Sequence, residues 1–198
     1  MRVILASASP RRAELLSAAG YTFEVLPVDV DESVRPGERP SAYVRRLAAR
    51  KSAQAMTQTQ ADGKHDLGRE VVVLGADTAV VVDDEILGKP RGDAEAQQML
   101  EQLSGRAHRV LTGVSVRRGV DEAGGVETTT VWFTRLAPQD VDWYVRSGEG
   151  RDKAGAYAIQ GLASRFIQRI EGSYSNVVGL PVAVVHELLR AVSASKRV

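Results

Sequence analysis

The sequence feature that most constrains the fold is a pair of apolar runs on either side of a single carboxylate. Residues 71–74 and 79–82 are apolar and rich in valine, and Gly75-Ala76-Asp77-Thr78 separates them. Continuous β-branched runs are typical of strands that are covered on both faces of an α/β sheet. We predict that the glycine makes a turn and ends the first strand. Asp77 would then lie at a strand end, where ligand-binding groups gather in such sheets.

Strands and helices alternate along the rest of the chain. A short strand over residues 3–6 precedes a helix that Ser9 caps and Pro10 begins. Apolar periodicity and turn residues predict strands at 22–28, 110–116 (half-exposed), 126–134 and 166–167, helices at 41–58, 93–103, 139–147 and from 181, a surface loop at 57–70, and a turn at 122–125. We therefore predict an α/β fold with a mixed twisted sheet and flanking helices, formed by one domain over residues 1–198.

The composition excludes several classes of protein. The chain has no cysteine and three scattered histidines, so disulfides, thiolate catalysis and Cys- or His-bound zinc are not expected. A metal ion would have to be held by oxygen ligands, which suits Mg²⁺ or Mn²⁺. The net charge of +1 and the 5% of aromatic residues argue against a nucleic-acid partner. The apolar runs are too short to span a membrane, so we expect a cytoplasmic protein.

A candidate anion site lies in Ser7-Ala8-Ser9-Pro10-Arg11-Arg12. Backbone N–H groups at the beginning of a helix bind anions, and arginine adds paired donors for phosphate. The alternative is a simple helix cap with Arg11 and Arg12 in solvent. However, cations in the first turn of a helix oppose its dipole by about 0.3–1 kcal/mol, so that alternative has a cost.

Two lysines are further candidates. Lys51 falls seven residues after Val44, on the apolar stripe of the predicted helix 41–58, so it must reach solvent, pair with an acid or bind an anion. Lys89 follows Gly88 and precedes Pro90, where an exposed turn lysine is the simpler interpretation. Cations that bind phosphates, together with carboxylates that hold a divalent ion, are what phosphoryl chemistry requires.

The chain resembles the Maf family of nucleotide pyrophosphatases over essentially its whole length. The segments that carry the resemblance are Leu5-Ala6-Ser7-Ala8-Ser9-Pro10-Arg11-Arg12, Asp31-Glu32, Lys51, Gly75-Ala76-Asp77-Thr78, Leu87-Gly88-Lys89-Pro90, Asp152-Lys153-Ala154-Gly155-Ala156-Tyr157, Ile159-Gln160-Gly161, Gly172-Ser173-Tyr174 and Val178-Gly179-Leu180-Pro181. The resemblance implies a fold related to inosine triphosphate pyrophosphatases, with two lobes around a cleft. It also implies metal-dependent hydrolysis of a nucleoside triphosphate at the bond between its α- and β-phosphates.

The resemblance is to the branch of the family that acts on dTTP and UTP, and it implies a role for each candidate residue. Asp77 would accept the proton of the attacking water, and Glu32 and Asp77 would hold the metal ion. The triphosphate would be bound by Ser7, Arg11, Arg12, Lys51 and Lys89. Base specificity would depend on Arg11, Thr78 and Gln160. A primary amide such as that of Gln160 offers a donor and an acceptor, which match N3–H and O4 of uracil or thymine.

One departure from that branch is Ala158, where glycine is usual, and it adds a methyl group to the loop that carries Gln160. Two other functions remain open. The chain could be a nucleotide-binding regulator of septum formation without catalysis, or a pyrophosphatase for purine nucleotides such as ITP and XTP. The expected partner is the nucleoside triphosphate, with neither nucleic acid nor membrane, and a homodimer is an open alternative to a monomer.

Overall fold

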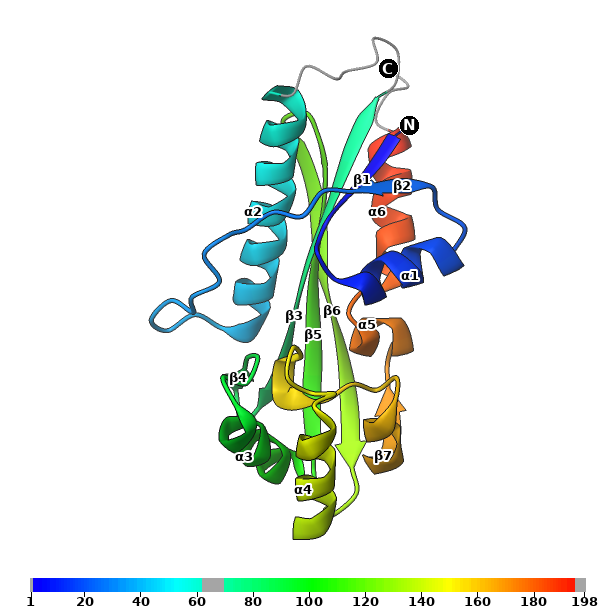
Figure 1. Ribbon diagram of the computed structural model, residues 1–198. Coiled ribbons are helices and arrows are strands. Elements are labelled where there is room, and N and C mark those ends of the chain that lie inside the picture. Colours follow the sequence, from blue (N-terminus) through cyan, green and yellow to red (C-terminus); the bar gives the residue numbers. More distant parts are fainter. Residues whose placement is uncertain (1, 62–69, 195–198) are drawn as a thin grey trace. The chain divides into compact units, whose positions relative to one another are not determined.

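The computed structural model describes residues 2–61 and 70–194 and contains a seven-stranded mixed sheet with flanking helices (Figure 1). The strand order is β2-β1-β3-β5-β6-β7, with β4 paired to β3. The strands are β1 (Arg2–Ala6), β2 (Phe23–Val25), β3 (Val71–Val82), β4 (Glu85–Leu87), β5 (Ala107–Arg118), β6 (Asp121–Phe133) and β7 (Ile167–Glu171). The predicted α/β class with a mixed sheet is confirmed.

The five predicted helices are present close to their expected positions, whereas one short α-helix and two 3₁₀ helices among the described residues were not predicted. The helices are α1 (Pro10–Ala18), α2 (Pro40–Ala61), α3 (Asp93–Leu103), α4 (Pro138–Ser147), α5 (Tyr174–Val178) and α6 (Val182–Ala194), with the 3₁₀ helices η1 (Ala154–Ala156) and η2 (Leu162–Phe166). Among the helices of the described residues, none combines the length and apolar character that crossing a bilayer requires.

The chain divides into two compact units. Unit 1 comprises Met1–Asp77, Thr112–Glu127 and Gly179–Val198, and unit 2 comprises Thr78–Leu111 and Thr128–Val178. Strands β3, β5 and β6 contribute residues to both units. The cleft that the family resemblance implies stays a prediction.

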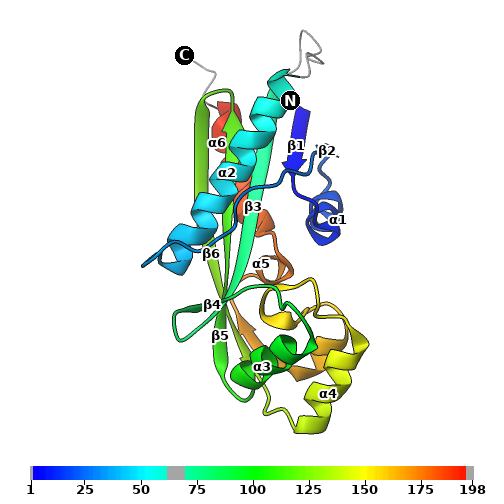
Figure 2. The ribbon, with the colours of Figure 1, turned by 60° about the vertical axis from the view of Figure 1, so that its left-hand side comes forward.

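Two apolar layers pack on the two faces of the sheet in unit 1. Strand β1 is parallel to β3, with Ile4 beside Val73 and Leu5 beside Leu74. Because neighbouring side chains point to opposite faces, one set packs against α2 and the other against α1 and α6. Ile4, Ala6 and Val73 contact Ala55 and Met56 of α2, and Leu5 and Leu74 pack with Leu16 and Leu189. Figure 2 shows α2 and α6 on opposite sides of the sheet.

The predicted turn at Gly75 is wrong, because β3 continues without a break through Asp77 to Val82. Gly75 is needed for space rather than for a turn. A Cβ atom there would lie 2.7 Å from the backbone nitrogen of Ser52 in α2 and still closer to the carbonyl oxygen of Ala48. Glycine inside a strand often marks such a close approach of another backbone. Asp77 therefore lies in the interior of a long strand rather than at its end.

Three other sequence predictions need correction. Helix α2 continues through Ala61, so residues 57–61 of the predicted loop at 57–70 are helical, and residues 62–69 lie outside the described part. Strand β5 is buried continuously over residues 110–116 rather than half-exposed. Its alternate face is covered by α2, whose backbone lies against Gly113. The turn between β5 and β6 is at residues 119–120 instead of 122–125, which lie within β6.

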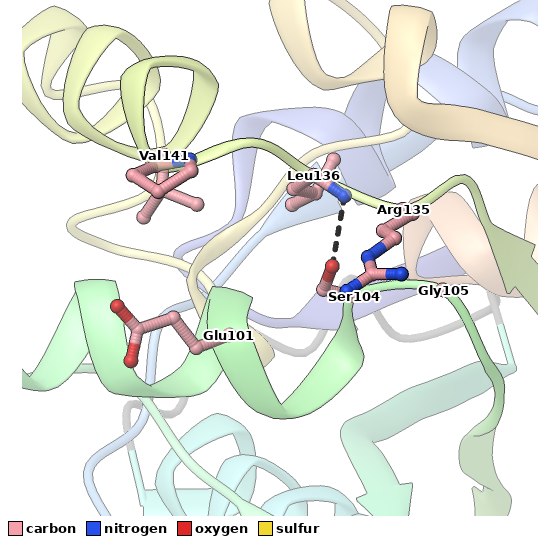
Figure 3. A pocket seen from close by; sticks show the side chains of 7 residues that line it. Glu101, Ser104, Gly105, Arg135, Leu136 and Val141 are labelled. Atoms are coloured by element: carbon pink, nitrogen blue, oxygen red, sulfur yellow. Dashed lines mark hydrogen bonds between the residues drawn. The ribbon is translucent and has the colours of Figure 1, made fainter.

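Unit 2 has a surface pocket of about 590 Å³ between the end of α3 and the beginning of α4 (Figure 3). Ser104 accepts a hydrogen bond from the backbone N–H of Leu136 at 2.8 Å in its wall. The pocket is lined by Glu101, Ser104, Gly105, Arg135, Leu136, Pro138 and Val141. None of these residues belongs to the predicted site.

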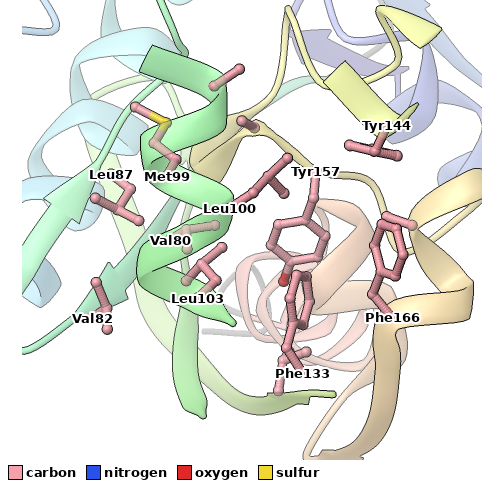
Figure 4. Close-up of a cluster of buried hydrophobic side chains, with 14 of the residues drawn as sticks. Val80, Val82, Leu87, Met99, Leu100, Leu103, Phe133, Tyr144, Tyr157 and Phe166 are labelled. Atoms are coloured by element: carbon pink, nitrogen blue, oxygen red, sulfur yellow. The ribbon is translucent and has the colours of Figure 1, made fainter. Parts of the chain in front are cut away.

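The core of unit 2 is built around aromatic rings (Figure 4). Tyr157 packs edge-to-face against Phe133, with ring centroids 4.9 Å apart, and its hydroxyl lies 2.8 Å from Nε2 of His108. His108 is buried, and its Nδ1 has no hydrogen-bond partner among the described residues. Burial alone lowers the pKa of His108 from 6.5 to about 4.

We predict that Gly75→Ala destabilises the protein by roughly 1–3 kcal/mol, because a backbone cannot yield as a flexible side chain can. The matched control is Gly125→Ala in β6, where the added Cβ would meet only a Val184 methyl at 3.8 Å. Urea unfolding at neutral pH measures both variants. Equal stability of the two would contradict the close approach of α2 to β3.

A second prediction concerns pH. A depressed pKa in the folded state means that His108 contributes stability above pH 6.5, and that this stability is lost as the pH falls toward 4. We expect the free energy of unfolding to fall by about 2 kcal/mol between pH 7 and pH 5 through this group. The variant His108→Gln should show a flatter dependence over the same window, whatever its stability at pH 7. An unchanged slope would show that His108 is not buried as a neutral ring.

Candidate active site

The loop between β1 and α1 has the form expected of an anion site. Ser7 follows the last residue of β1 and is buried, and its hydroxyl accepts a hydrogen bond from the backbone N–H of Ser9 at 3.2 Å. Ser9 is the N-cap residue of α1, as predicted, although its side chain makes no capping hydrogen bond. Pro10 begins the helix, where its missing N–H has no cost. The structure thus places the Ser7 side chain directly before the N-terminus of α1.

Arg12 is buried rather than solvent-exposed, and its guanidinium contacts three acceptors. Nε donates to the carbonyl oxygen of Gly179 at 2.8 Å, while Nη1 donates to Ala76 O at 2.9 Å and to Ser7 Oγ at 3.2 Å. Burial lowers the pKa of Arg12, whereas the carboxylates of Asp77 and Glu32 act to raise it. Arg12 therefore connects α1 with β3 and with the segment before α6.

Arg11 lies beside this network and is partly buried. Its charge is close enough to lower the pKa of Arg12. A second guanidinium next to a buried one is unfavourable unless negative charge compensates it. Asp77 and Glu32 supply part of this negative charge, and binding of an anion at this end of α1 stays a prediction.

Lys51 occupies the centre of the site in unit 1. Its Nζ donates to Asp77 Oδ1 and to Glu32 Oε1, each at 2.6 Å. The side chains of Lys51 and Asp77 are only 10% and 9% exposed, whereas that of Glu32 is 48% exposed. The lysine that falls on the apolar stripe of α2 is thus paired with acids, which was one of its three predicted explanations.

The environment of Asp77 shifts its pKa upward. Burial raises its pKa above the usual 3.8, although Lys51 and Arg12 hold the rise back. Side chains alternate along a strand, so Asp77 faces the same side of β3 as Gly75, which is the side that α2 covers. The narrow contact at Gly75 therefore brings Lys51 of α2 within reach of Asp77.

Tyr43 was not identified from the sequence as part of the site. Its hydroxyl donates to the backbone carbonyl oxygen of Glu32 at 3.0 Å and so anchors the segment that carries this acid. Burial, followed by the charges of Asp77 and Glu32, raises the pKa of Tyr43 to about 12. Helical spacing could have identified Tyr43 from the sequence, because Tyr43 and Lys51 are eight residues apart and therefore lie on the same buried face of α2.

The donor set around Lys51 fits a hard divalent cation. Glu32 and Asp77 each direct a carboxylate oxygen at the same positive group. Mg²⁺ is commonly bound by one or two carboxylates together with substrate phosphates and water. Within residues 2–61 and 70–194, no three His, Cys, Asp or Glu side chains form a cluster that could hold a metal ion without such added ligands. The residues present therefore suit a metal ion that is bound together with the substrate.

The remaining predicted residues, Thr78, Lys89 and Gln160, belong to unit 2. Thr78 follows Asp77 on β3, and Lys89 and Gln160 are exposed. The backbone N–H of Gly155 donates to Gly88 O at 3.0 Å, which connects the loop before Gln160 with the turn that carries Lys89. Gly155 has a φ of +67°, and a Cβ there would lie 2.8 Å from Val80. The structure therefore fixes this loop against β3 within unit 2.

The sequence matches the family described as Maf-like protein over residues 2–192. A dTTP/UTP pyrophosphatase of Anaeromyxobacter sp. is 51% identical over 96% of this chain and 88% of its own length. A dTTP/UTP pyrophosphatase of Vibrio cholerae is 48% identical over 95% and 96% of the two chains. Among solved structures, the Ham1 protein of Staphylococcus aureus covers 100% of both chains with a TM-score of 0.49 and 14% identity, which is too distant to support a conclusion.

Family membership rests on the length and level of these sequence matches. It agrees with the residues that the structure brings together in unit 1, namely Ser7, Arg12, Glu32, Lys51 and Asp77. The protein belongs to the Maf family.

Proposed function

We propose that this protein hydrolyses dTTP and UTP to the nucleoside monophosphate and pyrophosphate. The observation that carries the proposal is the buried contact of Lys51 with Asp77 and Glu32, beside the Arg12 guanidinium. Cations and acids packed together in this way suit a substrate that brings its own negative charge and a metal ion. Relatives that are 46–51% identical to this chain are named dTTP/UTP pyrophosphatase, which supports the same substrates.

The triphosphate is bound by Ser7, Arg11, Arg12, Lys51 and Lys89. Ser7 and the N-terminus of α1 offer hydrogen-bond donors to phosphate oxygens, and the cations neutralise the charge that develops on the leaving pyrophosphate. Arg12 already donates to three protein acceptors, so it acts mainly by its charge and by holding Ser7 in place.

The reaction is an attack of water on the α-phosphorus. A new bond forms between the water oxygen and phosphorus while the bond to the bridging oxygen of pyrophosphate breaks. The carboxylate of Asp77 accepts the proton of the water, and its raised pKa makes it a stronger base than an exposed aspartate. A divalent ion on Glu32 and Asp77 would supply charge neutralisation for the phosphate oxygens.

The base is selected by Gln160 and Thr78, with Arg11 as the third specificity residue. The amide of Gln160 offers an acceptor to N3–H and a donor to O4, which uracil and thymine share. Cytosine presents the opposite arrangement of donor and acceptor. Ala158 is accommodated in the buried part of the loop, two residues before Gln160.

We predict that Asp77→Asn lowers kcat for UTP about 10²–10³-fold, because an amide of the same shape cannot accept the proton. The control is Asp83→Asn in the exposed turn directly after the same strand, where the acid pairs with Arg106 at the surface. Release of pyrophosphate measures both, and circular dichroism checks their folding. Near-normal turnover by folded Asp77→Asn would exclude the role as proton acceptor.

The substrate range is a separate prediction. With Mg²⁺ or Mn²⁺, kcat/KM should be highest for UTP and dTTP in a panel that includes CTP, GTP, ITP and XTP. Chelation of the metal should abolish pyrophosphate release, and added metal should restore it. A preference for ITP or XTP would favour the purine pyrophosphatase. Tight binding of UTP without any release of pyrophosphate would favour a non-catalytic regulator.

A further inference from the structure

Gln160 alone does not explain a choice between uracil and cytosine. A primary amide carries a donor and an acceptor, and rotation by half a turn exchanges them. A freely moving Gln160 could therefore bind either base. Selectivity requires that the backbone of this loop be fixed so that only one orientation of the amide meets the base.

The structure contains a pair of side chains that holds the loop on both sides of Gln160. Before it, the backbone N–H of Ala158 donates to the hydroxyl of Tyr144 at 3.2 Å. After it, the backbone N–H groups of Leu162 and Ala163 donate to Glu149 Oε1 at 2.9 Å and Oε2 at 3.3 Å. The segment Ile159-Gln160-Gly161 is thus bracketed by hydrogen bonds to two residues.

The two residues are also bonded to each other. The Tyr144 hydroxyl donates to Glu149 Oε2 at 2.7 Å. Tyr144 is 1% exposed, and its ring packs edge-to-face against Phe166 at 5.7 Å between centroids. Figure 4 shows both rings within the core of unit 2. The hydroxyl that accepts from Ala158 therefore belongs to a buried, closely packed side chain on α4.

Two glycines make this arrangement possible. Gly148 has a φ of +71° at the C-cap of α4, and it ends the helix so that Glu149 follows at once. Gly161 has a φ of +119°, and a Cβ there would lie 3.0 Å from Glu149 Cδ and closer still to Oε1. The Glu149 carboxylate consequently lies directly against the backbone next to Gln160.

We propose that Tyr144 and Glu149 are positioning residues that set the base selectivity of the enzyme by fixing the backbone around Gln160. This inference rests on the proposed function, in which Gln160 reads the base. Neither residue touches the nucleotide in this proposal, and both act through the loop at residues 158–163.

The test compares kcat/KM for UTP with kcat/KM for CTP in single variants. Tyr144→Phe keeps the buried ring and removes the hydroxyl, and Glu149→Gln keeps the shape and removes the carboxylate. We expect the UTP/CTP ratio to fall about 5- to 30-fold in each, with the loss mainly in KM for UTP, as removal of one or two hydrogen bonds would give. Tyr174→Phe and Glu171→Gln are matched controls in unit 2 with exposed side chains, and their ratios should stay at the wild-type value.

A double-variant cycle shows whether the two residues act through Gln160. Gln160→Ala should lower the ratio by itself, and adding Tyr144→Phe should lower it little further, since the amide to be positioned is gone. Fully additive losses would overturn the proposal, as would a wild-type ratio in folded Tyr144→Phe and Glu149→Gln.

Hydrogen exchange tests, without any substrate, whether Tyr144 and Glu149 hold the backbone of the loop at residues 158–163. The amides of Ala158, Leu162 and Ala163 should exchange about 10-fold faster or more in Tyr144→Phe or Glu149→Gln, while core amides of β5 stay protected. Unchanged exchange at all three amides would overturn the proposal. This measurement does not depend on turnover, so it tests the hydrogen bonds of Tyr144 and Glu149 independently of the proposed function. Failure of the proposed function would appear instead as absence of UTP hydrolysis by the wild-type protein.

Discussion

The close approach of α2 to β3 is the constraint on which unit 1 depends. Gly75 and Gly113 lack the Cβ atoms that would hold the helix away from the sheet. Because the helix lies so near, Lys51 can place its ammonium between Asp77 and Glu32 although all but 10% of its side chain is buried. A buried charge needs partners, and here the partners are the two acids that we propose take part in the reaction. The ion pairs of Lys51 thus depend on the close contact between the backbones of α2 and β3.

Much of the fold was predictable from the sequence, as were several residues of the candidate site, and the errors have a common cause. The strand–helix pattern and the buried position of Lys51 follow from local periodicity. Gly75 was misinterpreted because a glycine serves either a turn or a close contact, and the chain alone does not tell which. Likewise, β5 was expected to be half-exposed from its alternating residue pattern, and the pattern does not show that α2, which is distant in sequence, covers the second face. Tyr43 was missed because its hydroxyl bonds a backbone carbonyl, which has no signature in the residue that carries it.

Both units rely on glycine to bring polar groups into close contact, but the polar groups differ. In unit 1, buried charges are neutralised by one another around Lys51. In unit 2, backbone N–H groups of a loop are satisfied by Tyr144 and Glu149, which a rigid helix and a packed core hold in place. In both, glycine permits a contact that any side chain would prevent. Loop geometry in unit 2 therefore depends on helix α4 as much as on the loop sequence itself.

The boundary between the units falls between Asp77 and Thr78, adjacent residues of one unbroken strand. The acid proposed to activate water thus belongs to one unit, and two of the three residues proposed to distinguish the base belong to the other. Because of this division, substitutions can affect the acid and these two specificity residues separately. Under the proposed roles, substitutions at Thr78 and Gln160 in unit 2 can therefore alter the base preference while Asp77 in unit 1 stays unchanged.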